Sequence, residues 1–117
     1  MAIVRCKDTT RFGGFTAGLV TILHAVVTVA ADLITPAEVL ITSGSDGQHL
    51  PHSRHYTFEA LDLRTHNFPT EAAILAFAQA LRARLGAGFT VLLEDPHKPN
   101  AHLHCQVRRT WHPAIHA

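Results

Sequence analysis

The sequence predicts an α+β fold, a small antiparallel sheet with flanking helices. Two apolar stretches with helical character, 15–34 and 67–85, predict the helices. Four short stretches of β-branched or alternating residues predict the strands. The chain has 117 residues, so we expect one domain, 1–117, with a single hydrophobic core.

The composition limits the kinds of partner that the protein is expected to bind. The formal net charge is +1 and charged residues make up 16% of the chain, which argues against a nucleic-acid partner and against substrates attracted by bulk charge. Cys6 and Cys105 are too few for a disulfide framework and match no zinc-ribbon spacing, so we expect reduced thiols, with a single disulfide as the alternative. Residues 1–14 lack the layout of a cleavable secretion signal, and the localisation stays unknown.

The first predicted helix, Phe15–Ile34, is almost wholly apolar. Its length makes a membrane span an alternative, but Gly18 and several polar positions favour a helix buried in a small core. Membrane contact is therefore not expected. His24 lies inside this stretch, and we expect a core histidine hydrogen-bonded to the backbone rather than a ligand.

A strand, a loop and a second strand follow. Residues 38–42, EVLIT, have the β-branched composition of a short strand. Residues 43–53 contain glycines, an aspartate and a proline, so this loop can turn back and present His55 at its end. Residues 60–65, ALDLRT, alternate cleanly, so we expect a strand with one apolar face and one face that meets water or a site.

The second predicted helix begins at 67–71, where a proline and an acidic residue suit a first turn, and ends before Gly86. Residues 89–94 and 102–108 then predict two strands that pair as a hairpin. No structure is assigned to 110–117. The second predicted helix has an apolar stripe that we expect to face the core: Ile74, Leu75, Phe77, Ala78, Leu81 and Leu85.

Histidine is the outlying residue type, because six of the ten histidines fall in 49–55 and 97–104. His102 and His104 are two apart in a predicted strand, so both side chains point to the same face. A catalytic zinc commonly takes three protein ligands and leaves a fourth position for water. His55, Asp62 and one of the two strand histidines fit that number of ligands.

A hydrolytic zinc site also needs a carboxylate that moves a proton to the leaving group. Glu94 ends the strand that enters the predicted hairpin, and Asp95 is the alternative. Cys105 alternates with His104 and is expected in the core. His49, His52 and His97 are expected to be loop residues.

These residues follow the pattern of a known family. The motifs Ser53-x-His55, Ala60-x-Asp62, Glu94 and His102-x-His104 resemble the zinc peptidases of the D-Ala-D-Ala carboxypeptidase and phage endolysin family. They also resemble the signalling domain of hedgehog proteins, which shares that fold. The similarity covers about 39–107.

The resemblance implies a role for each residue of the constellation. It makes His55, Asp62 and His104 the zinc ligands and Glu94 the general base. It makes His102 a histidine that does not bind the metal but polarises the scissile carbonyl or stabilises the oxyanion.

The chain departs from the family pattern at two places. The family usually has a glycine three residues after the first ligand, where this chain has Phe58. The carboxypeptidases also carry an arginine in an SGYR sequence to bind the substrate's terminal carboxylate, where this chain has Ser43-Gly44-Ser45-Asp46. This difference favours an endopeptidase, or a carboxypeptidase that takes its arginine from elsewhere.

Three functional interpretations remain open at this point. The first is a zinc peptidase that acts on peptidoglycan stem peptides or cross-links, in cell-wall lysis or remodelling. The second is a zinc-binding module of hedgehog-like fold that does not hydrolyse. The third is a histidine-rich metal buffer, which the spacing of the histidines disfavours.

Overall fold

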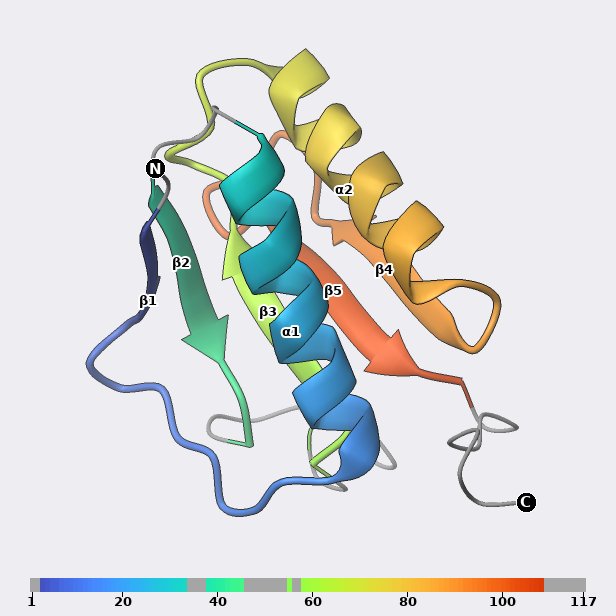
Figure 1. Cartoon of the computed structure of the whole chain (residues 1–117). Helices are drawn as coiled ribbons and strands as arrows, with labels where there is room; N and C mark the ends of the chain where they lie inside the picture. Colours follow the sequence, from blue (N-terminus) through green and yellow to red (C-terminus); the bar gives the residue numbers. More distant parts are fainter. Residues whose placement is uncertain (1–2, 34–37, 46–54, 56–57, 109–117) are drawn as a thin grey trace.

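A five-stranded sheet and two helices make up the fold (Figure 1). The computed structural model describes residues 3–33, 38–45, 55 and 58–108. The predicted α+β class is confirmed. The elements in chain order are β1 (Ile3–Cys6), α1 (Ala17–Asp32), β2 (Glu38–Ser43), β3 (Ala60–Arg64), α2 (Glu71–Leu85), β4 (Phe89–Glu94) and β5 (His102–Val107).

The sheet is mixed rather than antiparallel, which corrects the prediction. Its strand order is β1-β2-β3-β5-β4. The pairs β2–β3, β3–β5 and β4–β5 are antiparallel, and the last of these is the predicted hairpin. The N-terminal strand β1 was not expected, and it runs parallel to β2. A parallel pair needs a crossover connection, and α1 lies in that connection.

Both helices lie against the same face of the sheet (Figure 1). Side chains alternate between the two faces of a strand, and the apolar members of the alternation pack under the helices. In β3, Leu61 and Leu63 are completely buried there. Leu103 and Cys105 of β5 belong to the same core, together with Phe77 of α2. The other face of the sheet carries the polar members of the alternation.

The helix α1 begins after Thr16, whose side chain accepts a hydrogen bond from the Leu19 amide. Its buried residues recur at intervals of three and four: Gly18, Leu19, Ile22, Ala25, Val26, Val29 and Ala30. His24 falls outside this stripe and is exposed, so the expected core histidine was wrong. No helix among the described residues is long and apolar enough to cross a membrane.

The helix α2 begins after Thr70, which caps the Ala73 amide, and it ends at Gly86, whose φ of 80° suits glycine. Its predicted stripe is confirmed at the buried Phe77, Ala78 and Leu81, with Ile74 and Leu85 partly buried. Leu75 was wrongly included, because 49% of it is exposed.

Both cysteines are free thiols, as expected. Cys6 is exposed, whereas burial raises the pKa of the Cys105 thiol to about 12, which suits an inert core residue. The tail 110–117 and most of the predicted loop 43–53 lie outside the described residues.

Candidate metal centre

The uncovered face of the sheet presents a small set of polar side chains in neighbouring rows. Asp62 of β3 stands opposite His104 of β5. In the next row Arg64, His102 and Glu94 stand side by side on β3, β5 and β4. The register of three strands therefore gathers residues that are up to 42 positions apart in the sequence, and it places His102 and His104 on one face, as expected.

His55 reaches the same place from outside the sheet. Its Nδ1 donates a hydrogen bond to the backbone oxygen of Gly44, 2.5 Å away, which directs the other ring nitrogen toward Asp62. Gly44 has no room for a side chain, because an added Cβ would lie 2.4 Å from the backbone oxygen of Arg11 and 2.7 Å from the Phe12 ring. The backbone that orients His55 is thus fixed by close packing against residues 11 and 12.

Phe58 shapes the turn between His55 and β3. Its φ is 57°, in the left-handed region that favours glycine, at the position where the resembled family has a glycine. Thr16 donates a hydrogen bond of 2.7 Å to the Phe58 backbone oxygen. The ring lies so close to Gly13 and Gly14 that an added Cβ at either would approach it to 3.0 Å. These contacts hold a conformation that an aromatic residue does not prefer.

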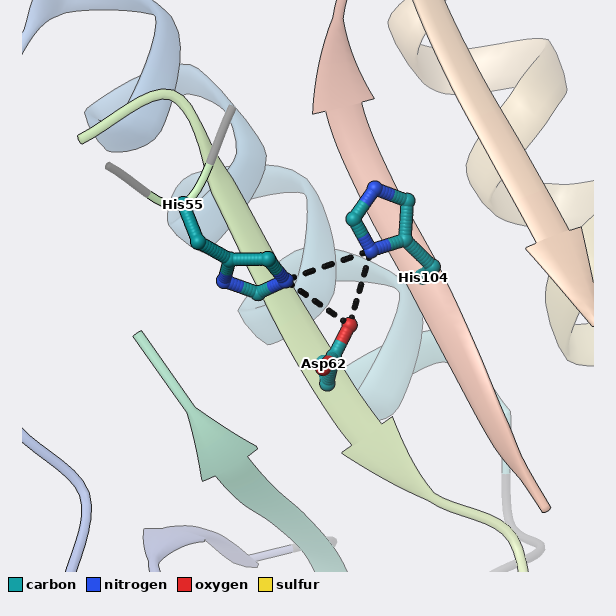
Figure 2. A group of neighbouring side chains, drawn as sticks. All are labelled: His55, Asp62 and His104. Carbon is teal, nitrogen blue, oxygen red and sulfur yellow. Dashed lines mark hydrogen bonds and ion pairs between the residues drawn. The ribbon is translucent and has the colours of Figure 1, made fainter. Parts of the chain in front are cut away.

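Three buried donor atoms converge at the centre of this face (Figure 2). His55 Nε2 lies 3.2 Å from Asp62 Oδ1 and 3.3 Å from His104 Nδ1, and the last two atoms are 2.9 Å apart. Zinc bonds to nitrogen or oxygen are about 2.0–2.2 Å long, so the ligands of a tetrahedral zinc stand roughly 3.3 Å apart. The triangle is therefore close to the size of one face of such a tetrahedron.

The outer hydrogen bonds of the two histidines leave their inner nitrogens suited to bind a cation. His55 Nδ1 donates to Gly44, and His104 Nε2 donates to the Gln106 side-chain oxygen at 2.8 Å. Because the proton of each neutral ring is held on the outer side, the inner nitrogens present lone pairs beside the Asp62 carboxylate. Three electron-pair donors that face one point need a metal ion or added protons between them, so this group can hold a metal ion.

In the metal-free site, the pKa shifts of Asp62 and His104 also favour positive charge beside the Asp62 carboxylate. Burial alone would raise the pKa of Asp62, but the hydrogen bonds from His104 and His55 outweigh it and hold that pKa well below its ordinary value. Burial would lower the pKa of His104, yet its hydrogen bonds to Asp62 and Gln106 raise it. Without a metal, the hydrogen bond between His104 and Asp62 therefore favours the charged form of both groups.

Glu94 and His102 lie beside the triangle, at its solvent side. His102 Nε2 donates to Glu94 Oε1 at 2.9 Å, and its Nδ1 donates to the backbone oxygen of Asn100. Glu94 Oε1 lies 3.9 Å from His104 Nδ1. The Glu94 side chain is 43% exposed and that of His102 is 22% exposed, so water can reach both. Glu94 and His102 also form a second group with Asp62 that has metal-ligand spacing.

The structure separates the alternatives that the sequence left open. His104, rather than His102, completes the triangle with His55 and Asp62. Asp95 bonds to Asn100 and contacts Lys98 within its own loop, and it belongs to neither group with metal-ligand spacing among the described residues. It is therefore the weaker candidate for the base.

The histidines that were expected to lie in loops are away from the candidate site or outside the described residues. The exposed His97 contacts Glu71, 3.7 Å away, while His49 and His52 fall in the part of the chain that is not described. The sequence analysis missed Gln106, although its place two residues after His104 on the same face was the available signal. Searches of protein-family models and of curated proteins find no match to this chain.

Proposed function

We propose that this protein is a zinc-dependent metallopeptidase that hydrolyses amide bonds in peptidoglycan peptides. The observation that supports the proposal best is the convergence of three buried donor atoms, on His55, Asp62 and His104, directly beside Glu94 and His102. A buried structural site would not need a solvent-accessible carboxylate at its edge. The resemblance to D-Ala-D-Ala carboxypeptidases and hedgehog domains supplies the substrate class and the proposed fold family.

The donor set suits zinc better than magnesium or calcium. Two imidazole nitrogens and one carboxylate oxygen form a typical catalytic zinc set, whereas magnesium and calcium prefer sites made of oxygen ligands. When bound, zinc would polarise the scissile carbonyl and lower the pKa of water at its open position. The three protein ligands leave the side near Glu94 and His102 for substrate and water.

Glu94 is the proposed general base. Its carboxylate stands at the edge of the site, partly exposed, and is held by the hydrogen bond from His102. From there it can take a proton from the attacking water and pass it to the nitrogen of the leaving amine.

His102 is the proposed stabiliser of charge on the scissile oxygen. Burial would lower the pKa of His102, but its bonds to Asn100 and Glu94 and the nearby charge of Asp62 raise it. The Nε2–H that bonds to Glu94 in this structure is the donor that we propose shifts toward developing negative charge on the scissile oxygen.

A zinc-binding module that does not hydrolyse is the second candidate. The observation that favours it is the way His55 joins a loop to the sheet, because a metal at the triangle would crosslink β3, β5 and that loop whether or not a reaction follows. Hydrolysis requires the Glu94 carboxylate as a base, whereas metal binding alone does not.

The test compares the wild type with Glu94→Gln, and uses Glu71→Gln, an exposed site on α2, as the matched control. Zinc per chain is measured on protein purified without chelator, and hydrolysis is measured as amines released from purified peptidoglycan. A peptidase should bind one zinc in all three proteins and lose at least roughly a hundredfold of its rate only in Glu94→Gln. One zinc without any hydrolysis would support the binding module, and absence of zinc would contradict both.

A further inference from the structure

A second set of possible metal ligands stands directly beside the first. Asp62, Glu94 and His102 each offer one ligand atom, and these atoms all lie within 4.8 Å of one another. His102 Nε2 lies 2.9 Å from Glu94 Oε1 and 3.8 Å from Asp62 Oδ1. The ligand atoms of one tetrahedral zinc stand roughly 3.3 Å apart, so the two distances lie on either side of that value. Small side-chain movements would let the three atoms surround one cation.

The backbone fixes which nitrogen of His102 faces the two carboxylates. Its Nδ1 donates a hydrogen bond of 2.9 Å to the backbone oxygen of Asn100, so the Nδ1 proton stays on the outer side of the ring. Nε2 is directed toward Glu94 and Asp62. When Nε2 releases its own proton to solvent, it presents a lone pair beside two carboxylate groups. Outer hydrogen bonds orient ligand histidines in this way at metal sites.

Asp62 belongs to both sets of ligands. A carboxylate has two oxygens and can bind two cations at once, and the paired metals of hydrolytic enzymes stand about 3.5–4 Å apart. Glu94 is also close to the first set, because its Oε1 lies 3.9 Å from His104 Nδ1. The two sets therefore form neighbouring sites with a common ligand.

A cleft of about 410 Å³ gives solvent access to the second set. Asp62 and His102 line this cleft, and the Glu94 side chain is partly exposed. A metal ion and the waters that complete its coordination can therefore enter from solvent. One imidazole and two carboxylates suit zinc. The second site should be the weaker of the two, because it shares Asp62 and takes a divalent ion beside another.

We propose that Asp62, Glu94 and His102 bind a second, weaker zinc ion, and that this ion inhibits hydrolysis. The site depends only on these three side chains, whereas the inhibition rests on the proposed function. Zinc at the second site engages the Glu94 oxygen that would accept the proton of the attacking water. It also replaces the Nε2 proton that His102 would donate. Excess zinc therefore stops the reaction while the first ion stays in place.

Calorimetric titration of the one-zinc protein with further zinc tests the second site. We expect a second binding event at least roughly a hundredfold weaker than the first. His102→Ala and Glu94→Gln should each remove this event and leave the first zinc bound, whereas Glu94→Asp, which keeps the charge, should only weaken it. Thermal unfolding of each variant shows that it is folded, and Glu94→Asp keeps the test valid if another variant is not.

The matched controls are His97→Ala and Glu71→Gln, which change an exposed histidine and an exposed carboxylate outside both sets. Both variants should keep the second event with unchanged affinity. A second event that survives in His102→Ala or in Glu94→Gln would show binding by other histidines of the chain, and it would overturn the proposal. Absence of a second event in the wild type would overturn it as well.

Cobalt substitution shows whether the two ions are adjacent. Metal-free protein receives one and then two equivalents of Co²⁺, and the paramagnetic signal of each form is recorded by EPR. Two ions that share Asp62 should couple magnetically, so the signal per cobalt should fall at the second equivalent in the wild type and stay constant in Glu94→Gln. A constant signal per cobalt in the wild type would overturn the shared site.

The rate of amine release from peptidoglycan, measured at increasing zinc, tests the inhibition. The rate should fall at least roughly a hundredfold as the second site fills, with its midpoint at the affinity found by calorimetry. A rate that stays constant or rises over this range would overturn the inhibition. A coupled second ion in protein that releases no amines would support the site and contradict the peptidase. Hydrolysis without a second binding event would support the peptidase and overturn the site.

Discussion

The two faces of the sheet are made by alternating residues of the same strands, yet they differ in burial, in polarity and in charge. Under the helices, Leu103 and Cys105 of β5 are completely buried among apolar side chains. On the opposite face, their immediate neighbour His104 is held by hydrogen bonds and ion pairs to polar partners. One strand thus contributes to the core and to the candidate metal centre through adjacent residues.

The difference between the faces separates the residues that form the hydrophobic core from those that form the candidate metal centre. The covered face gains its stability from buried apolar surface, which does not depend on pH or metal. The stability of the open face depends on charge, because the buried Asp62 carboxylate is held by its hydrogen bond to His104, which lowers the pKa of Asp62 and raises that of His104. Substitutions at neighbouring positions should therefore have different kinds of effect.

The largest effect is expected on the open face, at His104. His104→Ala removes one of the three proposed zinc ligands, and structural zinc sites contribute about 10–16 kcal/mol in total, so the affinity for zinc should fall roughly a thousandfold or more. Competition with a chelator of known affinity measures this loss. Full zinc binding by the variant would show that the ligand assignment is wrong, and His102 would be the first replacement to test.

Leu103→Ala makes the complementary change on the covered face. It removes a completely buried leucine from the core, so the free energy of unfolding should fall by about 2–5 kcal/mol. Denaturant unfolding of the metal-free protein measures this change. The zinc affinity of the folded variant should stay within a few-fold of the wild type. A loss as large as that of His104→Ala would contradict the claim that the covered face contributes to stability and not to metal binding.

Gly44→Ala tests whether the Gly44 backbone, which orients His55, is needed for zinc binding on the open face. The added methyl group would clash with the Arg11 backbone and the Phe12 ring, displacing the oxygen that accepts the His55 hydrogen bond. Zinc affinity should fall roughly tenfold to a hundredfold, as for other groups that orient metal ligands. Gly86→Ala, the same change at the distant end of α2, should lower stability without altering zinc affinity, and equal effects on zinc would contradict the role of Gly44.

The smallest expected effect is a difference in pH dependence between the metal-free and zinc-loaded proteins. The raised pKa of His104 contributes stability that is fully present below its ordinary value of 6.5 and is lost as pH rises through the raised pKa. The lowered pKa of Asp62 contributes stability that is present above 3.8 and is lost as pH falls through the lowered pKa.

Metal-free protein should therefore become less stable as pH rises above about 6.5, whereas the stabilisation by zinc should increase, because the ligands must release protons to bind it. Thermal unfolding across pH, with and without zinc, measures both trends. Parallel trends in the two forms would contradict the proposed exchange of protons for metal at this face.

Local patterns in the sequence were enough to predict the two helices and four of the strands. The alternation in residues 60–65 and the turn residues around 95–101 are local signals, and 89–94 was predicted with the bounds that β4 has. The strand β1 was missed because it has four mostly exposed residues, and its parallel pairing depends on a partner about 35 positions away. Because β1 pairs parallel to β2 while the other pairs are antiparallel, the sheet is mixed.

The sequence could not choose between His102 and His104 for a physical reason. Both point to the same face, and only the register between β3 and β5, which places His104 opposite Asp62, separates them. His24 was misplaced for a similar reason, since α1 is so uniformly apolar that its sequence does not show which side meets the sheet. The metal, the reaction and the catalytic roles of Glu94 and His102 stay predictions.

The register between β3 and β5 also has a consequence for the order of folding. Asp62 and His104 are 42 positions apart, and β5 is the last strand in chain order among the residues that the structure describes. The β4–β5 hairpin closes a short loop and can form early, whereas the pairing of β3 with β5 must close a much longer one. During synthesis the candidate metal centre therefore cannot assemble until β5 has emerged, so a metal ion would bind a nearly finished sheet rather than nucleate it.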